Sequence, residues 1–84
     1  MNPALKPYAV VRVLQLVAHE IDRDGWCVNL RSPQTGDIGT LVDVLHADGF
    51  PSRYVVECCN PDGTTVWLSE FVSKELELVL SPHA

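Results

Sequence analysis

The sequence predicts an all-β domain of five short strands closed into a small barrel. Short apolar segments, several with β-strand alternation, recur along the chain. They are separated by strong turn signals, namely Asp24-Gly25, Asp48-Gly49 and the quartet Asn60–Gly63. The 84 residues are enough for one domain with one small core, and barrel closure would remove exposed sheet edges. We therefore expect a single domain over residues 1–84, with flexible ends at residues 1–8 and 81–84.

The first apolar segment, Tyr8–Ile21, fits two structures. Its valines favour a strand over residues 9–17. A short helix is the alternative, because Val10, Leu14, Val17 and Ile21 would then share one face. Pro7 prevents such a helix from extending back through residues 4–6.

The next strands are predicted from turns and alternation. Trp26–Leu30 belongs to an irregular, hairpin-like insertion and is compatible with a short strand outside the five. Residues 31–37 form a loop, and Thr40–Leu45 is the clearest strand. Either Leu41 and Val44 or Val42 and Val44 face the core there. Period-two alternation favours one face with Thr40, Val42 and Val44 and the other with Leu41, Asp43 and Leu45. Gly36 and Gly39 mark a sharp bend into this strand, because glycine tolerates a positive φ or a close backbone approach.

The second half of the chain predicts a hairpin and a closing strand. Arg53–Cys59 is a strand with Tyr54, Val56 and Cys58 on one face. Residues 60–63 form a type I turn with a left-handed glycine, and the chain returns as the strand Thr64–Leu68. Residues 69–74 form a short helical or 3₁₀ turn, and residues 75–80 form the last strand.

Several of these segments resemble a known family. The stretch from Gly36 to Leu45, the strand around Tyr54–Glu57, the Asp62-Gly63 turn and the leucine-rich end are similar to DUF4926, a family of small SH3-like barrel proteins of unknown function. The likeness covers roughly residues 36–80. More distantly, the layout resembles KOW-type modules and the SH3-like domain of nitrile hydratase β subunits. The resemblance implies an SH3-like barrel with an interaction surface, and it implies no reaction.

The charge disfavours nucleic acid and anionic membrane surfaces as partners. The net charge is −5, and from Tyr54 onward Lys74 is the one basic residue, against Glu57, Asp62, Glu70, Glu75 and Glu77. A nucleic-acid binder needs Lys and Arg to displace counterions from phosphates. With no signal peptide or membrane-spanning run visible, we expect a cytoplasmic protein with reduced thiols.

No residue pattern predicts catalysis, a metal or another cofactor. Cys27, Cys58 and Cys59 lack the pairwise spacing of zinc sites, and adjacent strand cysteines point to opposite faces. Cys58 is expected in the core and Cys59 as a partly exposed thiol. Asp43, His46 and Asp48 could in principle form a carboxylate–histidine pair, but their place at the end of a strand favours a solvated loop. We expect that the protein is not an enzyme.

The remaining hypothesis is a non-catalytic module that binds a protein partner. Its candidate binding residues are Trp26, Phe50, Arg53 and Tyr54, since aromatic residues and arginine near loops form interface hot spots. Trp67 and Phe71 are expected in the core, whereas Trp26 fits core and surface equally well. The alternative is an accessory, small-molecule-linked or metal-linked subunit of an enzyme, by fold analogy to the nitrile hydratase β domain.

Overall fold

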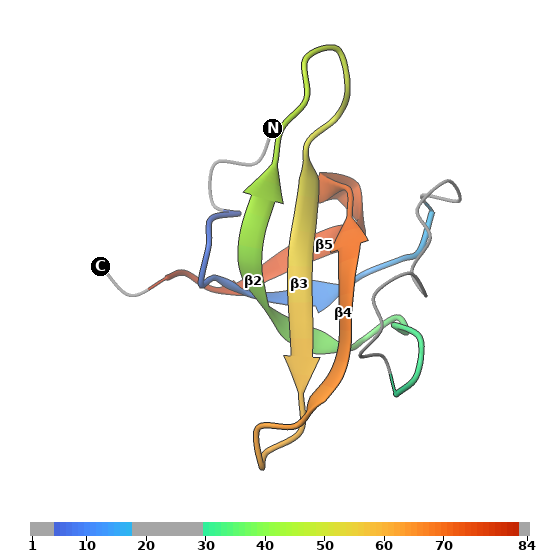
Figure 1. The fold of residues 1–84 in the computed structure, drawn as a ribbon, viewed down its shortest axis with the longest axis vertical. Coiled ribbons are helices and arrows are strands. Elements are labelled where there is room, and N and C mark those ends of the chain that lie inside the picture. Colours follow the sequence, from blue (N-terminus) through green and yellow to red (C-terminus); the bar gives the residue numbers. More distant parts are fainter. Residues whose placement is uncertain (1–4, 18–29, 83–84) are drawn as a thin grey trace.

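The protein is an all-β domain with five antiparallel strands in one strongly bent sheet. The computed structural model describes residues 5–17 and 30–82. The strands are β1 (Val10–Val13), β2 (Ile38–Leu45), β3 (Arg53–Cys59), β4 (Thr65–Phe71) and β5 (Leu76–Leu80). Their order in the sheet is β4-β3-β2-β1-β5. β2, β3 and β4 lie side by side, and β1 and β5 cross them (Figure 1).

A tight turn joins β3 to β4. Gly63 has a φ of +90° and donates its N–H to the Asn60 carbonyl at 2.9 Å, while the Asn60 N–H binds the Thr64 carbonyl at 2.8 Å. The Asp62 carboxylate accepts the Thr64 N–H at 2.9 Å. These bonds are those of a type I turn with a left-handed glycine, so the predicted hairpin is confirmed.

A β-bulge in β2 bends the sheet. Leu41 pairs with Val56 and Asp43 pairs with Val55, so Val42 lies between them without a partner in β3. The extra residue brings both Leu41, which is fully buried, and Val44 toward the core, while Val42 is exposed. Of the two predicted core pairs, the structure contains Leu41 and Val44. The regular alternation that placed Val42 with Val44 and Leu41 on the opposite face was wrong, because the bulge interrupts it.

The two glycines before the bulge serve the two purposes expected of them. Gly36 has a φ of +95°, in the left-handed region that glycine favours. Gly39 lies against β3, where a Cβ atom would be 2.6 Å from the Glu57 carbonyl oxygen and 2.8 Å from Val56 Cγ1. The first glycine therefore turns the chain, and the second lets two backbones approach each other.

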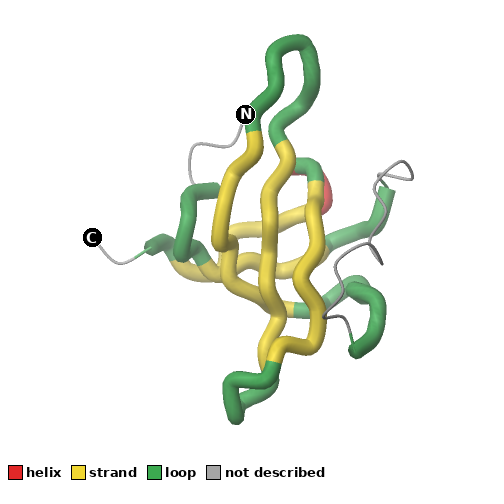
Figure 2. Tube along the Cα trace, viewed as in Figure 1, coloured by secondary structure: helices red, strands yellow, loops and turns green. Residues whose placement is uncertain are grey.

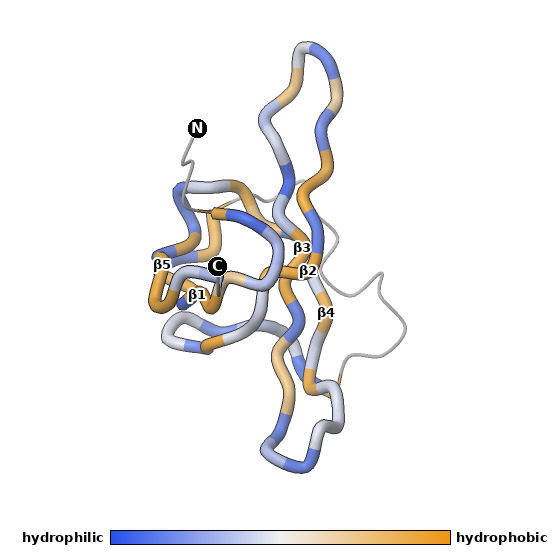
Figure 3. The backbone as a smooth tube through the Cα atoms, turned by 90° about the vertical axis from the view of Figure 1, so that its left-hand side faces the viewer, coloured by the Kyte–Doolittle hydropathy of each residue, from blue (hydrophilic) through white to orange (hydrophobic). Residues whose placement is uncertain are grey.

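The core lies in the angle between β2–β4 and the β1–β5 pair. Trp67 and Phe71 are fully buried at its centre, with ring centroids 5.5 Å apart. Leu5 is also buried in it, although residues 1–8 were expected to be a flexible end. Figure 3 shows hydrophobic stretches where the two parts of the sheet meet, and hydrophilic segments interspersed with hydrophobic ones at the β2–β3 hairpin end. The other buried core residues are Ala9, Val11, Val13, Leu41, Tyr54, Val56, Cys58, Val66 and Leu76.

Two predicted strand ends were wrong by three residues or more. β4 continues to Phe71, because Ser69 and Phe71 extend the inward alternation begun by Trp67, and the 3₁₀ turn follows at Ser73–Glu75. Figure 2 shows this one helical turn between β4 and β5. β1 ends at Val13 rather than at residue 17, because the backbone and side chains of residues 14–17 bond to the 3₁₀ turn instead of to a strand.

Buried Glu75 holds this 3₁₀ turn against the end of β1. Its carboxylate accepts the Val72 N–H at 2.9 Å and the Val17 N–H at 2.8 Å, and its carbonyl accepts the Leu14 N–H at 2.7 Å. The Gln15 side-chain amide also donates to the Lys74 carbonyl at 3.0 Å. Backbone N–H groups that no strand uses are thereby satisfied.

Candidate functional site

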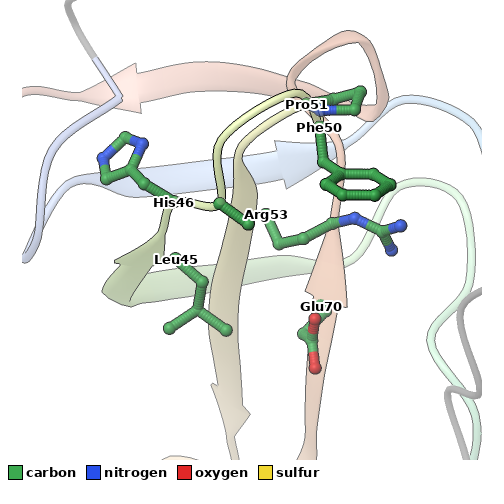
Figure 4. Close-up of a pocket in the computed structure, with 7 residues that line it drawn as sticks. Leu45, His46, Phe50, Pro51, Arg53 and Glu70 are labelled. Carbon is green, nitrogen blue, oxygen red and sulfur yellow. The ribbon is translucent and has the colours of Figure 1, made fainter.

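A pocket of about 330 Å³ opens at the end of the β2–β3 hairpin. It lies on the outer face of the sheet, away from the core, and the β2–β3 loop forms one of its walls (Figure 4). Its lining combines apolar side chains with one cation and one anion. The lining residues are Leu45, His46, Ala47, Phe50, Pro51, Arg53 and Glu70.

The loop geometry exposes Phe50 at this pocket. Gly49 has a φ of +80°, and the Phe50 N–H closes a turn onto the Ala47 carbonyl at 3.1 Å. His46 Nδ1 lies 2.8 Å from the Ser52 hydroxyl oxygen, which ties the two sides of the loop together. The Phe50 side chain is left 72% exposed, the second highest exposure among the large hydrophobic residues described.

Arg53 is the cation of the pocket. It pairs with Leu45 across the two strands, and its side chain runs beside the Phe50 ring in Figure 4. Within residues 5–17 and 30–82, its guanidinium forms no hydrogen bond or ion pair. Phe50 and Arg53, two of the four residues predicted to bind a partner, therefore lie together.

The other two predicted residues do not line this pocket. Tyr54 points to the core and is 3% exposed, because neighbouring residues of a strand face opposite sides of the sheet. Trp26 lies outside the described residues. Sequence reasoning missed Leu45 and Glu70, and Glu70 was missed because it was assigned to a helical turn. Strand alternation was the signal that could have identified Leu45, because it points the Leu45 side chain outward, as it does that of Arg53.

A second polar cluster, around Asp37, is built into the structure. The carboxylate accepts a bidentate pair of bonds from the Arg31 guanidinium at 2.7 and 3.0 Å, the Gln34 N–H at 2.9 Å and Trp67 Nε1–H at 2.9 Å. Burial alone would raise the pKa of Asp37, but the bonds from Arg31, Gln34 and Trp67 outweigh it and lower that pKa. Because its bonding capacity is filled from within the chain, this cluster fastens the 31–37 loop to the core.

Cys58 and Cys59 lie in settings that disfavour the thiolate, and Cys27 lies outside the described residues. Cys58 is buried and Cys59 exposed, as predicted. Burial and the Asp37 carboxylate raise the pKa of the Cys58 thiol, and desolvation and the Glu57 carboxylate raise that of Cys59. In the described part of the chain, no three side chains of His, Cys, Asp or Glu are grouped to hold a metal ion.

The Asp43, His46 and Asp48 side chains form no acid–base pair over the described ranges. His46 bonds to Ser52, and the Asp43 carboxylate accepts the N–H of the adjacent Val44 at 2.8 Å. Asp48 is exposed in the loop. The solvated-loop interpretation therefore accounts for these residues.

No helix among residues 5–17 and 30–82 is long and apolar enough to cross a membrane. No protein-family model, curated protein or solved structure matches this chain.

Proposed function

We propose that this protein is a non-catalytic protein-interaction module of the SH3-like barrel type. It binds a protein partner through a hairpin surface formed by Leu45, Phe50 and Arg53. The observation that carries the proposal is Phe50, a large aromatic side chain held 72% exposed beside a pocket and beside Arg53, which forms no ion pair within the described residues. The family resemblance and the sheet order β4-β3-β2-β1-β5 support the fold assignment.

The energetics favour a bound partner over water at this surface. Burying a phenylalanine side chain contributes about 1.5 to 3 kcal/mol. Arginine is enriched among interface hot spots, and its guanidinium donates directed hydrogen bonds to acceptors of a partner. The turn at Ala47–Phe50 fixes the loop beforehand, so less conformational entropy is lost on binding.

The test is capture of partners by the tagged full chain, expressed at its native level and analysed by mass spectrometry. We expect one stoichiometric partner with the wild type, and its loss with Phe50→Ser or Arg53→Ala. Leu80→Ala is the matched control, because Leu80 is also an exposed apolar residue, 63% exposed, but lies in β5 at the other edge of the sheet from β4. Thermal unfolding of each variant checks the fold. Retention of every partner by a folded Phe50→Ser variant would show that the hairpin surface is not the binding site.

A further inference from the structure

The pocket continues into an acidic strip on the same face of the sheet. Asp43 precedes Leu45 by two residues in β2, and Glu57 follows Arg53 by four residues in β3, so all four side chains project outward. Asp43 pairs with Val55, and Glu57 pairs with Thr40, one further step from the hairpin end. The apolar pocket and the two carboxylates therefore follow one another along the strands.

The two carboxylates are not neutralised by described basic side chains. From the described part of the chain, the Asp43 carboxylate accepts only the Val44 N–H, and the Glu57 carboxylate accepts the Thr65 hydroxyl at 2.6 Å. The basic residues within 5–17 and 30–82 are Lys6, Arg12, Arg31, Arg53 and Lys74. Arg12 is paired with Glu77 and Arg31 with Asp37, and no ion pair joins Lys6 or Lys74 to either carboxylate. Arg53 lies at the pocket end of the face. The face below the pocket is therefore negatively charged, in a chain of net charge −5.

We propose that the partner contacts the hairpin surface with a basic segment that begins with an apolar residue. The apolar side chain packs against Phe50 and Leu45, and lysine or arginine side chains lie over Asp43 and Glu57. This inference rests on the proposed function and names the chemistry of the partner. Charge complementarity favours a basic protein segment, because the same carboxylates repel nucleic-acid phosphates.

The strand geometry sets the spacing of the partner's residues. Strand residues rise about 3.3 Å each, so Asp43 lies roughly 7 Å along β2 from Leu45, and Glu57 roughly 13 Å along β3 from Arg53. An extended partner segment has the same rise. Its basic residues therefore fall two and four positions after the apolar one.

The probe is a synthetic seven-residue peptide with phenylalanine at its second position, lysines two and four positions later, and serine elsewhere. It is titrated into the full ¹⁵N-labelled chain at low ionic strength and followed by NMR. We expect shifts at the amides of Asp43, Leu45 and Phe50, and a loss of affinity with added salt. Two matched peptides, one with glutamate for both lysines and one with serine for the phenylalanine, should cause no such shifts. Equal binding of the glutamate peptide would overturn the proposal.

Variants of the strip test the carboxylates separately from the fold. Asp43→Asn and Glu57→Gln keep an oxygen that can accept the Val44 N–H and the Thr65 hydroxyl. Each should weaken lysine-peptide binding about two- to fivefold, as expected for an exposed ion pair. Glu77→Gln, a carboxylate of β5, is the control and should leave peptide binding unchanged. Unchanged affinity in both strip variants would contradict the proposal.

The two proposals fail in distinguishable ways. If Phe50→Ser abolishes partner capture but neither the lysine peptide nor the strip variants show an effect, the hairpin surface stands and the basic segment is wrong. If capture survives Phe50→Ser, the proposed function itself is wrong. Sedimentation velocity tests a second copy as the occupant, and Phe50-dependent self-association of the pure chain would overturn the basic partner.

Discussion

Gly39 is the residue at which the sheet has no room for a side chain. A Cβ atom there would lie 2.6 Å from a backbone oxygen of β3, and backbone cannot move aside as a side chain end does. We expect Gly39→Asn to destabilise the fold by about 1 to 3 kcal/mol in urea unfolding, as overpacking does. The control is Gly49→Asn, at a φ of +80° with no atom within 4 Å, which should cost far less because asparagine tolerates this region. Equal losses would show that crowding by β3 is not the cause.

Asp37 should make stability depend on acid. The pKa of Asp37 in the folded protein is below the ordinary value of 3.8. Its contribution to the free energy of unfolding is therefore complete above about pH 5 and is lost as the pH falls below 3.8 through the folded-state pKa. We expect Asp37→Asn to lose about 1.5 to 3 kcal/mol of unfolding free energy at pH 7, since it removes bonds to a charged group.

Urea unfolding of both proteins from pH 7 to pH 2 provides the check on Asp37. The difference between wild type and Asp37→Asn should shrink toward zero at the acid end. Asp62→Asn, a change at the exposed β3–β4 turn, is the control and should retain the acid-dependent loss due to Asp37. If the stability difference between wild type and Asp37→Asn were the same at every pH, the ionised Asp37 carboxylate would not be its cause.

The 3₁₀ turn is an element held by one buried side chain, that of Glu75. Glu75→Ala leaves the N–H groups of Val72 and Val17 without their acceptor, which should cost about 2 to 5 kcal/mol. Glu75→Gln should cost less, because one acceptor oxygen remains. The checks are urea unfolding and loss of hydrogen-exchange protection at the Val17 amide. Glu77→Ala is the control, since it removes only an exposed ion pair with Arg12 worth less than about 1 kcal/mol. A Glu75→Ala variant as stable as Glu77→Ala would contradict this role.

The whole molecule closes through the pairing of β1 with β5. Val13 pairs with Leu76, so strands from the two ends of the domain must meet before the core is complete. We therefore expect folding in milliseconds to seconds by stopped-flow fluorescence of the tryptophans. A chain ending at Lys74 should show no cooperative unfolding, because it lacks buried Glu75 and Leu76. A chain ending at Leu80 is the control and should unfold cooperatively. Cooperative unfolding of the shorter chain would show that β5 is dispensable.

Local signals predicted most of the fold, and long-range contacts account for the rest. The β3–β4 hairpin follows from Asn60–Gly63 and the alternation around it, both of which act between neighbours in sequence. The bulge at Val42 depends on pairing with β3, and the burial of Glu75 depends on N–H groups that come from residue 17. Neither the bulge nor the burial of Glu75 can be predicted from a local sequence pattern.

The candidate site was predictable only in part, for the same reason. Phe50 follows a turn signal that exposes it, so its place was readable from its neighbours. Arg53 and Tyr54 could not both have faced a partner, because consecutive strand residues point to opposite sides. Glu70 joins the pocket through the pairing of β4 with β3, which is not visible before the strands are aligned.

Val42 is one extra residue in β2, and it reverses whether odd- or even-numbered residues of the strand face the core. Before it, odd-numbered residues such as Gly39 and Leu41 face inward, and after it the even-numbered Val44 does. Loss of Val42 alone would leave Leu41 inside, Asp43 outside and Val44 inside, in unbroken alternation. Loss of Leu41 or Val44 would instead remove a residue of the core. A relative of this chain that lacks Val42 would therefore keep the same residues on each face of β2. It would lose the bend that the bulge produces.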